Sequence, residues 1–117
     1  MSQHEVERGQ IWLVDWSPGR GSEQHGRRPA VIIQTDAANR NPRYPNTIVL
    51  TLSTKGLAVA AHVEIAPDSQ NGLRTTSWVK CEQILTISKE RLMEFWGHLS
   101  PKDLVRVEMA VRTVLSL

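Results

Sequence analysis

The order of patterns along the chain is the feature that most limits its fold, because strand-like segments come first and helical patterns come only near the end. Stretches rich in glycine, proline and asparagine, which break both helices and strands, separate the strand-like segments. Successive strands of this kind favour an antiparallel sheet over alternating strand and helix units. Six segments have the branched and aromatic residues, or the apolar–polar alternation, of β-strands: residues 10–16, 30–35, 47–53, 59–65, 75–81 and 84–87.

Two helices are expected after these strands. Ser88 is placed to cap a short helix that runs through Phe95. At Ser100 a capping serine is followed by Pro101 at the first helical position and by Asp103 three residues after the cap. The expected fold class is therefore mainly β with C-terminal helices, in a small curled antiparallel sheet or barrel. The last helix has one apolar stripe for the sheet, made by Leu104, Val107, Val111, Val114 and Leu115.

Composition predicts one domain over residues 1–117. The chain has 117 residues, 40% of them hydrophobic, and this is enough for a core without metal or disulfide support. Cys81 is the only cysteine, which excludes an internal disulfide and is typical of the reducing cytoplasm. We expect a cytoplasmic protein with no membrane contact, because no apolar run approaches the roughly 18 residues of a membrane helix.

Positive charge is concentrated in two loops, although the net charge is only +2. Residues 17–28 have three glycines and one proline in twelve positions, and a loop of this length in a small domain often binds a ligand. Together with the next loop it gives residues 17–45 five arginines against two acids, a local excess of +3. Guanidinium groups bind phosphate in a bidentate way, so the cluster suits a phosphate-containing partner; solvated loop charge is the alternative reading.

The remaining polar residues give weaker signals. His25 lies in the glycine-rich loop as a candidate acid–base group, whereas His62 and His98 are expected to be ordinary surface residues. Ser53 and Thr54 end the third strand, where their hydroxyls either donate to a phosphate or only mark the strand end. The histidines and the cysteine lack metal-ligand spacing, and no glycine pattern matches a nucleotide fingerprint. Neither a metal nor a cofactor is expected.

Several motifs together resemble the MazF/PemK family of toxin endoribonucleases. They begin with RGQIWLVD at residues 8–15, Ser17-Pro18, GSEQ at residues 21–24 and Arg28-Pro29 before a valine–isoleucine strand. Near the end, QILTI at residues 83–87 is followed by Lys89 and Arg91-Leu92, so the resemblance spans nearly the whole chain. It implies a small SH3-like barrel of the CcdB/PemK type, a homodimer, and a cognate acidic antitoxin of a type II system. Binding of operator DNA through the antitoxin complex is also implied.

The resemblance assigns site residues one by one. The catalytic arginine before proline falls on Arg28, and the hydroxyl at the end of the third strand falls on Ser53, with Thr54 as the alternative. Glu23 matches the acid of the loop motif, to fix loop geometry or, less favoured, to transfer a proton. His25 is a lower-ranked catalytic candidate. RNA-binding residues are expected at Arg20, Arg27, Arg40, Arg43, Tyr44 and Gln83.

The implied activity is metal-independent, sequence-specific cleavage of single-stranded RNA to a cyclic phosphate and a 5′-hydroxyl. Messenger RNA is the expected substrate, with ribosomal or transfer RNA as further targets, and cleavage would inhibit translation and growth. Glu23, His25 and water remain open as the general base, since arginine has a pKa above about 12. The alternative function is a non-catalytic protein on the same barrel, such as a gyrase-poisoning toxin or a nucleic-acid-binding module.

Overall fold

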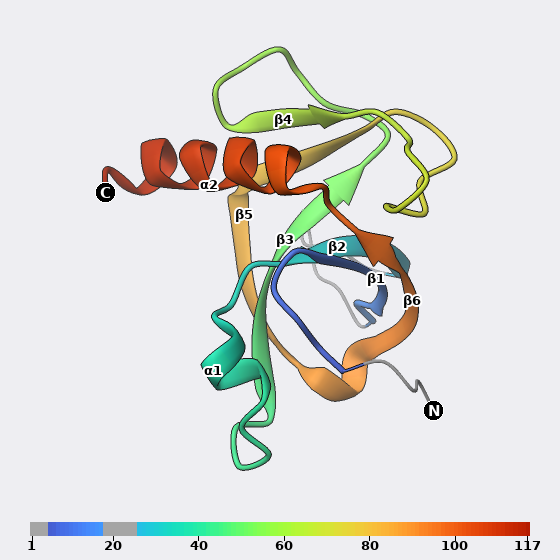
Figure 1. Cartoon of the computed structure of the whole chain (residues 1–117), viewed down its shortest axis with the longest axis vertical. Helices are drawn as coiled ribbons and strands as arrows, with labels where there is room; N and C mark the ends of the chain where they lie inside the picture. The colour runs from blue at the N-terminus through green and yellow to red at the C-terminus, as the bar shows by residue number, and fades with distance from the viewer. Residues whose placement is uncertain (1–4, 18–25) are drawn as a thin grey trace.

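The structure, a computed structural model, describes residues 5–17 and 26–117 and has one curled six-stranded sheet. The strand order is β4-β5-β3-β2-β1-β6, and every neighbouring pair is antiparallel. Figure 1 shows the sheet curling so that helix α2 crosses one part of it. The predicted mainly β fold with a C-terminal helix is confirmed. The strands are β1 (Gln10–Asp15), β2 (Arg27–Ile32), β3 (Asn46–Ser53), β4 (His62–Ile65), β5 (Ser77–Ser88) and β6 (Leu92–His98).

Helix α2 (Pro101–Leu115) begins where the capping pattern predicts. Ser100 Oγ accepts a hydrogen bond from Asp103 N–H at 3.1 Å, and Pro101 occupies the first turn. The helix buries Val107 and Ala110 against the sheet. No helix among the described residues is long and apolar enough to cross a membrane.

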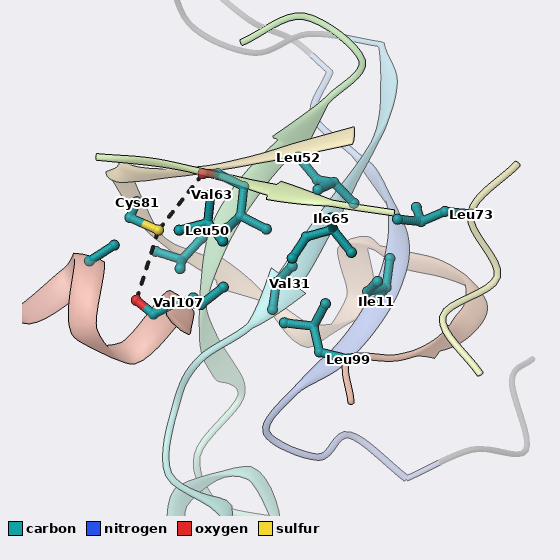
Figure 2. Close-up of a cluster of buried hydrophobic side chains, with 12 residues drawn as sticks. Ile11, Val31, Leu50, Leu52, Val63, Ile65, Leu73, Cys81, Leu99 and Val107 are labelled. Atoms are coloured by element: carbon teal, nitrogen blue, oxygen red, sulfur yellow. Dashed lines mark hydrogen bonds between the residues drawn. The ribbon is translucent and has the colours of Figure 1, made fainter. Parts of the chain in front are cut away.

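Two apolar clusters lie on opposite faces of the sheet, because neighbouring residues of a strand point to opposite sides. The first, which we call the α2-side core, packs under α2 and is drawn in Figure 2. It includes Val31, Leu50, Leu52 and Val79. The second, which we call the inner core, consists among the described residues of Trp12, Val14, Trp16, Ala30, Ile32, Val49 and Ile87.

Several elements differ from the sequence-based expectations. β2 spans Arg27–Ile32, three residues earlier than the strand predicted over residues 30–35. The two strands predicted around residues 75–87 form one strand, β5, whose pairing with β3 shifts register between Leu50 and Thr51. The helix predicted from Ser88 through Phe95 is wrong. Ser88 does cap, but only a 3-10 turn (Lys89–Arg91) forms before β6 pairs with β1. Pairing with β1 and the edge-to-face contact of Phe95 with Trp12, at 5.6 Å between ring centroids, outweigh the local capping signal.

The loop expected over residues 36–46 contains a short helix, α1 (Asp36–Asn39). The side chain of Asn39 is buried there and accepts a hydrogen bond from Thr47 Oγ1 at 2.8 Å. Asn39 also donates to the backbone oxygen of Gln34 at 3.0 Å. These bonds attach α1 to the start of β3.

Candidate active site

One face of the sheet, opposite the α2-side core, gathers polar side chains where β2 begins and β3 ends. The register of β3 with β5 and of β5 with β4 places Ser53 beside Trp78, and Lys80 between Thr51 and His62. Because residues paired across antiparallel strands share a face, these side chains lie on one surface. We call it the polar face and define it by Arg28, Thr51, Ser53, His62, Trp78 and Lys80.

Arg28 joins this face from β2. It lies two residues before Ala30, which pairs with Thr51, and Ser53 lies two residues after Thr51 on the antiparallel neighbour. Arg28, near the start of β2, and Ser53, at the end of β3, therefore lie at the same end of the sheet, and their side chains point to the same side. Arg28 is exposed, and its guanidinium makes no hydrogen bond or ion pair with any residue that the structure describes. Its guanidinium donors are therefore not committed to any described residue.

Ser53 is oriented by the segment that follows it. Its Oγ accepts a hydrogen bond from Lys55 N–H at 3.1 Å. Because that bond uses a lone pair of Oγ, the hydroxyl proton stays available as a donor. Thr54 is exposed in the bend after the strand. The structure thus places Ser53, and not Thr54, on the polar face with Arg28.

Gln83 is held at the register shift of β5. Its Oε1 accepts from Thr51 Oγ1, and this bond fixes the orientation of the amide beside the polar face. Sequence reasoning singled out Gln83 but not Thr51. Thr51 lies two residues before Ser53 on β3, so the two side chains point to the same face. This spacing is the sequence signal that identifies Thr51.

The glycine-rich loop is anchored at both of its described ends. Trp16 N–H donates to Gly26 O at 2.8 Å, and Trp16 Nε1 donates to Arg28 O at 3.1 Å. Arg91 Nη1 donates to the backbone oxygens of Asp15 at 3.0 Å and Ser17 at 2.8 Å. The strand end that carries Arg28 is therefore tied to the end of β1, which is in turn tied to the 3-10 turn. Three residues singled out in the sequence, Arg20, Glu23 and His25, lie outside the described residues.

The other predicted RNA-binding residues are spread over the molecule. Arg27 is exposed and directly precedes Arg28 in β2, so its side chain points to the other side of the strand. Arg40, Arg43 and Tyr44 lie before β3 begins, and Figure 1 shows this loop and α1 at the end of β3 remote from β4. Seven residue steps along β3 amount to about 23 Å, so the structure does not bring these residues together with Arg28 and Ser53.

The loop after α1 is held by ion pairs of Arg40 and by hydrogen bonds from Lys89. Arg40 forms ion pairs with Glu7 at 3.4 Å and Asp36 at 3.9 Å. Lys89 Nζ donates to backbone oxygens of Asn39 at 2.9 Å and Tyr44 at 2.7 Å. Lys89 and Arg91, noted in the sequence only as parts of a motif, each use a cation to hold a loop by its backbone carbonyls.

His62 is not the ordinary surface residue that its place in the alternation predicts. Its side chain is only 8% exposed, with Nε2 2.9 Å from Glu82 Oε2. Its Nδ1 accepts a hydrogen bond from Leu57 N–H at 3.0 Å. The alternating pattern predicted the correct face for His62 but not its burial. Glu82, which contacts His62, lies in the irregular part of β5.

The pKa of Glu82 is lower than its ordinary value. Burial alone would raise the pKa of this carboxyl. The hydrogen bond from His62, the carboxyl's own backbone N–H and the charge of Lys80 together outweigh that effect. Glu82 is thus an anion that holds the imidazole in place.

Cys81 is not available as a nucleophile, and the part of the chain that the structure describes has no cluster suited to a metal. Cys81 is buried, and burial, followed by the charge of Glu82, raises the pKa of its thiol to about 12. Its Sγ lies 3.8 Å from the backbone oxygen of Val79 and 3.9 Å from that of Val107, on the side away from the polar face. Figure 2 shows Cys81 beside Val107 of α2. No group of three or more histidine, cysteine or acidic residues is placed to hold a metal within residues 5–17 and 26–117.

Two named relatives align with this chain over most of its length. The endoribonuclease MazF of Staphylococcus epidermidis is 37% identical over 115 residues, which cover 96% of this chain and 92% of that protein. The endoribonuclease EndoA of Bacillus subtilis is 35% identical over 112 residues, which cover 96% of each.

Solved structures agree in fold. A mycobacterial endoribonuclease, solved with its cognate antitoxin, superimposes with a TM-score of 0.79 at 25% identity and 96% coverage of each chain. MazF of Deinococcus radiodurans, at 18% identity, covers 97% of this chain and 99% of that one with a TM-score of 0.80, which shows the shared fold. A family profile described as PemK-like, MazF-like toxin of type II toxin-antitoxin system matches residues 7–115. The chain therefore belongs to this PemK-like, MazF-like toxin family.

Proposed function

We propose that this chain is a toxin that cleaves single-stranded RNA without a metal ion and is neutralised by a cognate antitoxin. The observation that carries the proposal is the pairing of Arg28 and Ser53 on the polar face. A guanidinium and a hydroxyl leave neighbouring strands at the same end, and neither donor is committed to a described residue. Family membership and the relatives named as endoribonucleases support RNA as the substrate.

The pair suits a reaction in which the substrate supplies its own nucleophile. The ribose 2′-oxygen forms a bond to the adjacent phosphorus, the bond from phosphorus to the 5′-oxygen breaks, and a cyclic phosphate and a 5′-hydroxyl result. The 2′-hydroxyl loses a proton and the 5′-oxygen gains one. Negative charge grows on the non-bridging oxygens meanwhile, and donors placed where this charge develops accelerate the reaction.

Arg28 and Ser53 have separate roles in this scheme. The Arg28 guanidinium gives two directed hydrogen bonds to phosphate oxygens. The Ser53 hydroxyl, whose Oγ already accepts from Lys55 N–H, donates to a phosphate oxygen. Proton transfer from the 2′-hydroxyl is left to Glu23, His25 or water.

The partners follow from the same chemistry. An acidic antitoxin segment and RNA both present anions, so we expect them to compete for the surface around Arg28. A homodimer would present two such surfaces related by a two-fold axis, and operator DNA would be bound through the antitoxin complex. RNA affinity of the Arg28→Lys variant with and without antitoxin tests the overlap: simultaneous, independent binding of both would contradict it. We place the protein in the cytoplasm, where its RNA substrates are.

The direct test is incubation of the purified protein with mixed-sequence RNA in EDTA, followed by analysis of the product ends. We expect cutting of single-stranded RNA, cyclic phosphate and 5′-hydroxyl ends, and resistance of DNA and double-stranded RNA. A paired base resists because unstacking it costs a few kcal/mol. Loss of cleavage on chelation would refute the metal-free reaction. Absence of cleavage together with inhibition of DNA gyrase would favour the non-catalytic alternative.

A further inference from the structure

The segment after Ser53 is fastened to the sheet at three points. Lys55 N–H donates to Ser53 Oγ at 3.1 Å, and Leu57 N–H donates to His62 Nδ1 at 3.0 Å. Between these two bonds, Gly56 lies so close to Trp78 that a Cβ atom on the glycine would be 2.2 Å from Trp78 Cγ. The backbone of residues 55–57 is thereby held against the polar face.

The two ring nitrogens of His62 have different partners, which define the protonation of the ring. Nδ1 accepts from Leu57 N–H, so it carries a lone pair and no proton. Nε2 lies 2.9 Å from Glu82 Oε2, an acceptor, so the ring proton is on Nε2. We assign the neutral Nε2–H tautomer from these partners. Glu82 thus selects the tautomer that leaves Nδ1 free to accept from Leu57.

We propose that His62 is a positioning residue for the Ser53 hydroxyl, acting through the backbone of residues 55–57. This inference rests on the proposed function, since it gives a role to a residue that does not itself reach the reacting atoms. The side chain of His62 is 8% exposed and its nitrogens are both engaged within the protein. His62 Nδ1 holds Leu57 N–H, the backbone of residues 55–57 connects Leu57 to Lys55, and Lys55 N–H in turn orients Ser53 Oγ.

The physical consequence concerns the direction of the Ser53 proton. While Lys55 N–H occupies a lone pair of Oγ, the O–H bond is directed away from the Lys55 amide and is available to a phosphate oxygen. Without the His62 acceptor, Leu57 N–H loses its partner and the segment is free to move away. The Ser53 hydroxyl then samples other rotamers, and fewer of them donate to the transition state. The loss should therefore appear in kcat more than in KM.

Two substitutions separate the roles of the two ring nitrogens. In His62→Asn, the side-chain oxygen is at the reach of Nδ1 and accepts from Leu57 N–H, while contact with Glu82 is lost. In His62→Gln, the side-chain amide is at the reach of Nε2 and donates to Glu82, while Leu57 N–H loses its acceptor. Glu82→Gln is the matched control, because its amide oxygen still accepts from Nε2–H without the charge.

The measurements are kcat and KM on a fluorogenic RNA, with hydrogen exchange of the Lys55 and Leu57 amides on the same preparations. We expect His62→Gln to lose about tenfold in kcat with KM little changed and with faster exchange at both amides. His62→Asn should keep kcat within about threefold and retain protection at Leu57. Glu82→Gln should behave like the wild type. Long-range ¹⁵N spectra of the wild-type imidazole should show the proton on Nε2.

Equal kcat in His62→Asn and His62→Gln, or wild-type kcat in His62→Gln, would overturn the positioning role. If His62→Gln does not fold, Glu82→Ala releases the ring while leaving Nδ1 present; a several-fold fall in kcat is then expected, and an unchanged kcat contradicts the proposal. If the wild-type protein cuts no RNA, the proposed function fails on its own. Hydrogen exchange then decides the remaining claim, which is overturned if His62→Gln leaves both amides protected as in the wild type.

Discussion

The two faces of strands β3, β4 and β5 share one backbone but differ in what they contribute. On one face Leu52 and Val79 are buried in the α2-side core. On the other face the neighbouring residues Ser53 and Lys80 belong to the polar face, with Arg28 beside them at the start of β2. Because side chains alternate along a strand, stability and proposed chemistry lie one residue apart in sequence and on opposite sides of the sheet. Substitutions on the two faces should therefore move different measured quantities.

The largest effect is expected from Arg28→Lys. Lysine keeps the positive charge but gives no pair of directed hydrogen bonds to a phosphate, so cleavage should fall about 100-fold or more. RNA affinity and the free energy of unfolding should change little, because Arg28 is exposed and unpaired among the described residues. Arg112→Lys on α2 is the matched control. Near-normal cleavage by Arg28→Lys would remove Arg28 from the proposed reaction.

Gly56→Ala should be an exception to the separation of the two faces. Its Cβ would lie 2.2 Å from Trp78 Cγ and 2.5 Å from Trp78 Cβ, atoms too near the backbone to swing away. Overpacking of this kind costs about 1–3 kcal/mol, and the displaced Lys55 amide should also lower kcat. Urea unfolding and cleavage assays check both, with Ala58→Ser, exposed in the same loop, as the control. Unchanged stability would mean that Trp78 and the loop separate readily.

The buried thiol of Cys81, in the α2-side core, should make the protein less stable in alkali. Its pKa is raised from 9.0 to about 12 by burial and by the charge of Glu82. The unfolded chain therefore loses the thiol proton first, and the contribution of Cys81 is full below pH 9.0 and is lost as pH rises towards 12. Chemical unfolding across this range should show a steeper decline in the wild type than in Cys81→Ala. Parallel declines would contradict a buried, protonated thiol.

The smallest effect is expected in acid, from Glu82. Its pKa in the folded protein lies below the ordinary 4.5, so its contribution is present above pH 4.5 and is lost as pH falls through the folded value. The effect is modest because the side chain is well exposed. Unfolding curves on the acid side of pH 4.5 should fall slightly faster for the wild type than for Glu82→Gln. Identical slopes would indicate that the carboxyl gains nothing from His62.

Periodic sequence patterns predicted the elements whose signals are local. The branched runs became β1 to β4, and the cap at Ser100 with Asp103 began α2 as expected. β6 was missed because its formation depends on pairing with β1, more than 70 residues away in the chain, and Ser88 offered a competing local signal. Sequence separation of that kind leaves no mark in a local pattern.

The part of the candidate site that lies at strand ends could be predicted from the sequence. Arg28 and Ser53 were singled out by a motif and by their strand ends, and the antiparallel register brings both to one face. Arg43 and Tyr44 were grouped with them by charge and loop composition, but the length of β3 separates the two loops. His62 was misjudged because its cover, Glu82, comes from a register shift that alternation alone does not reveal.

Leu52 and Ser53 are consecutive residues on opposite faces of β3, and replacing each by alanine tests the central claim most directly. Leu52 is 2% exposed within the α2-side core, and Ser53 is on the polar face. Leu52→Ala should lower the free energy of unfolding by about 2–5 kcal/mol and leave kcat of the folded protein within about twofold. Ser53→Ala should lower kcat at least about tenfold and leave stability within about 0.5 kcal/mol. Full cleavage by Ser53→Ala, above all if Thr54→Ala is inactive, would contradict the account.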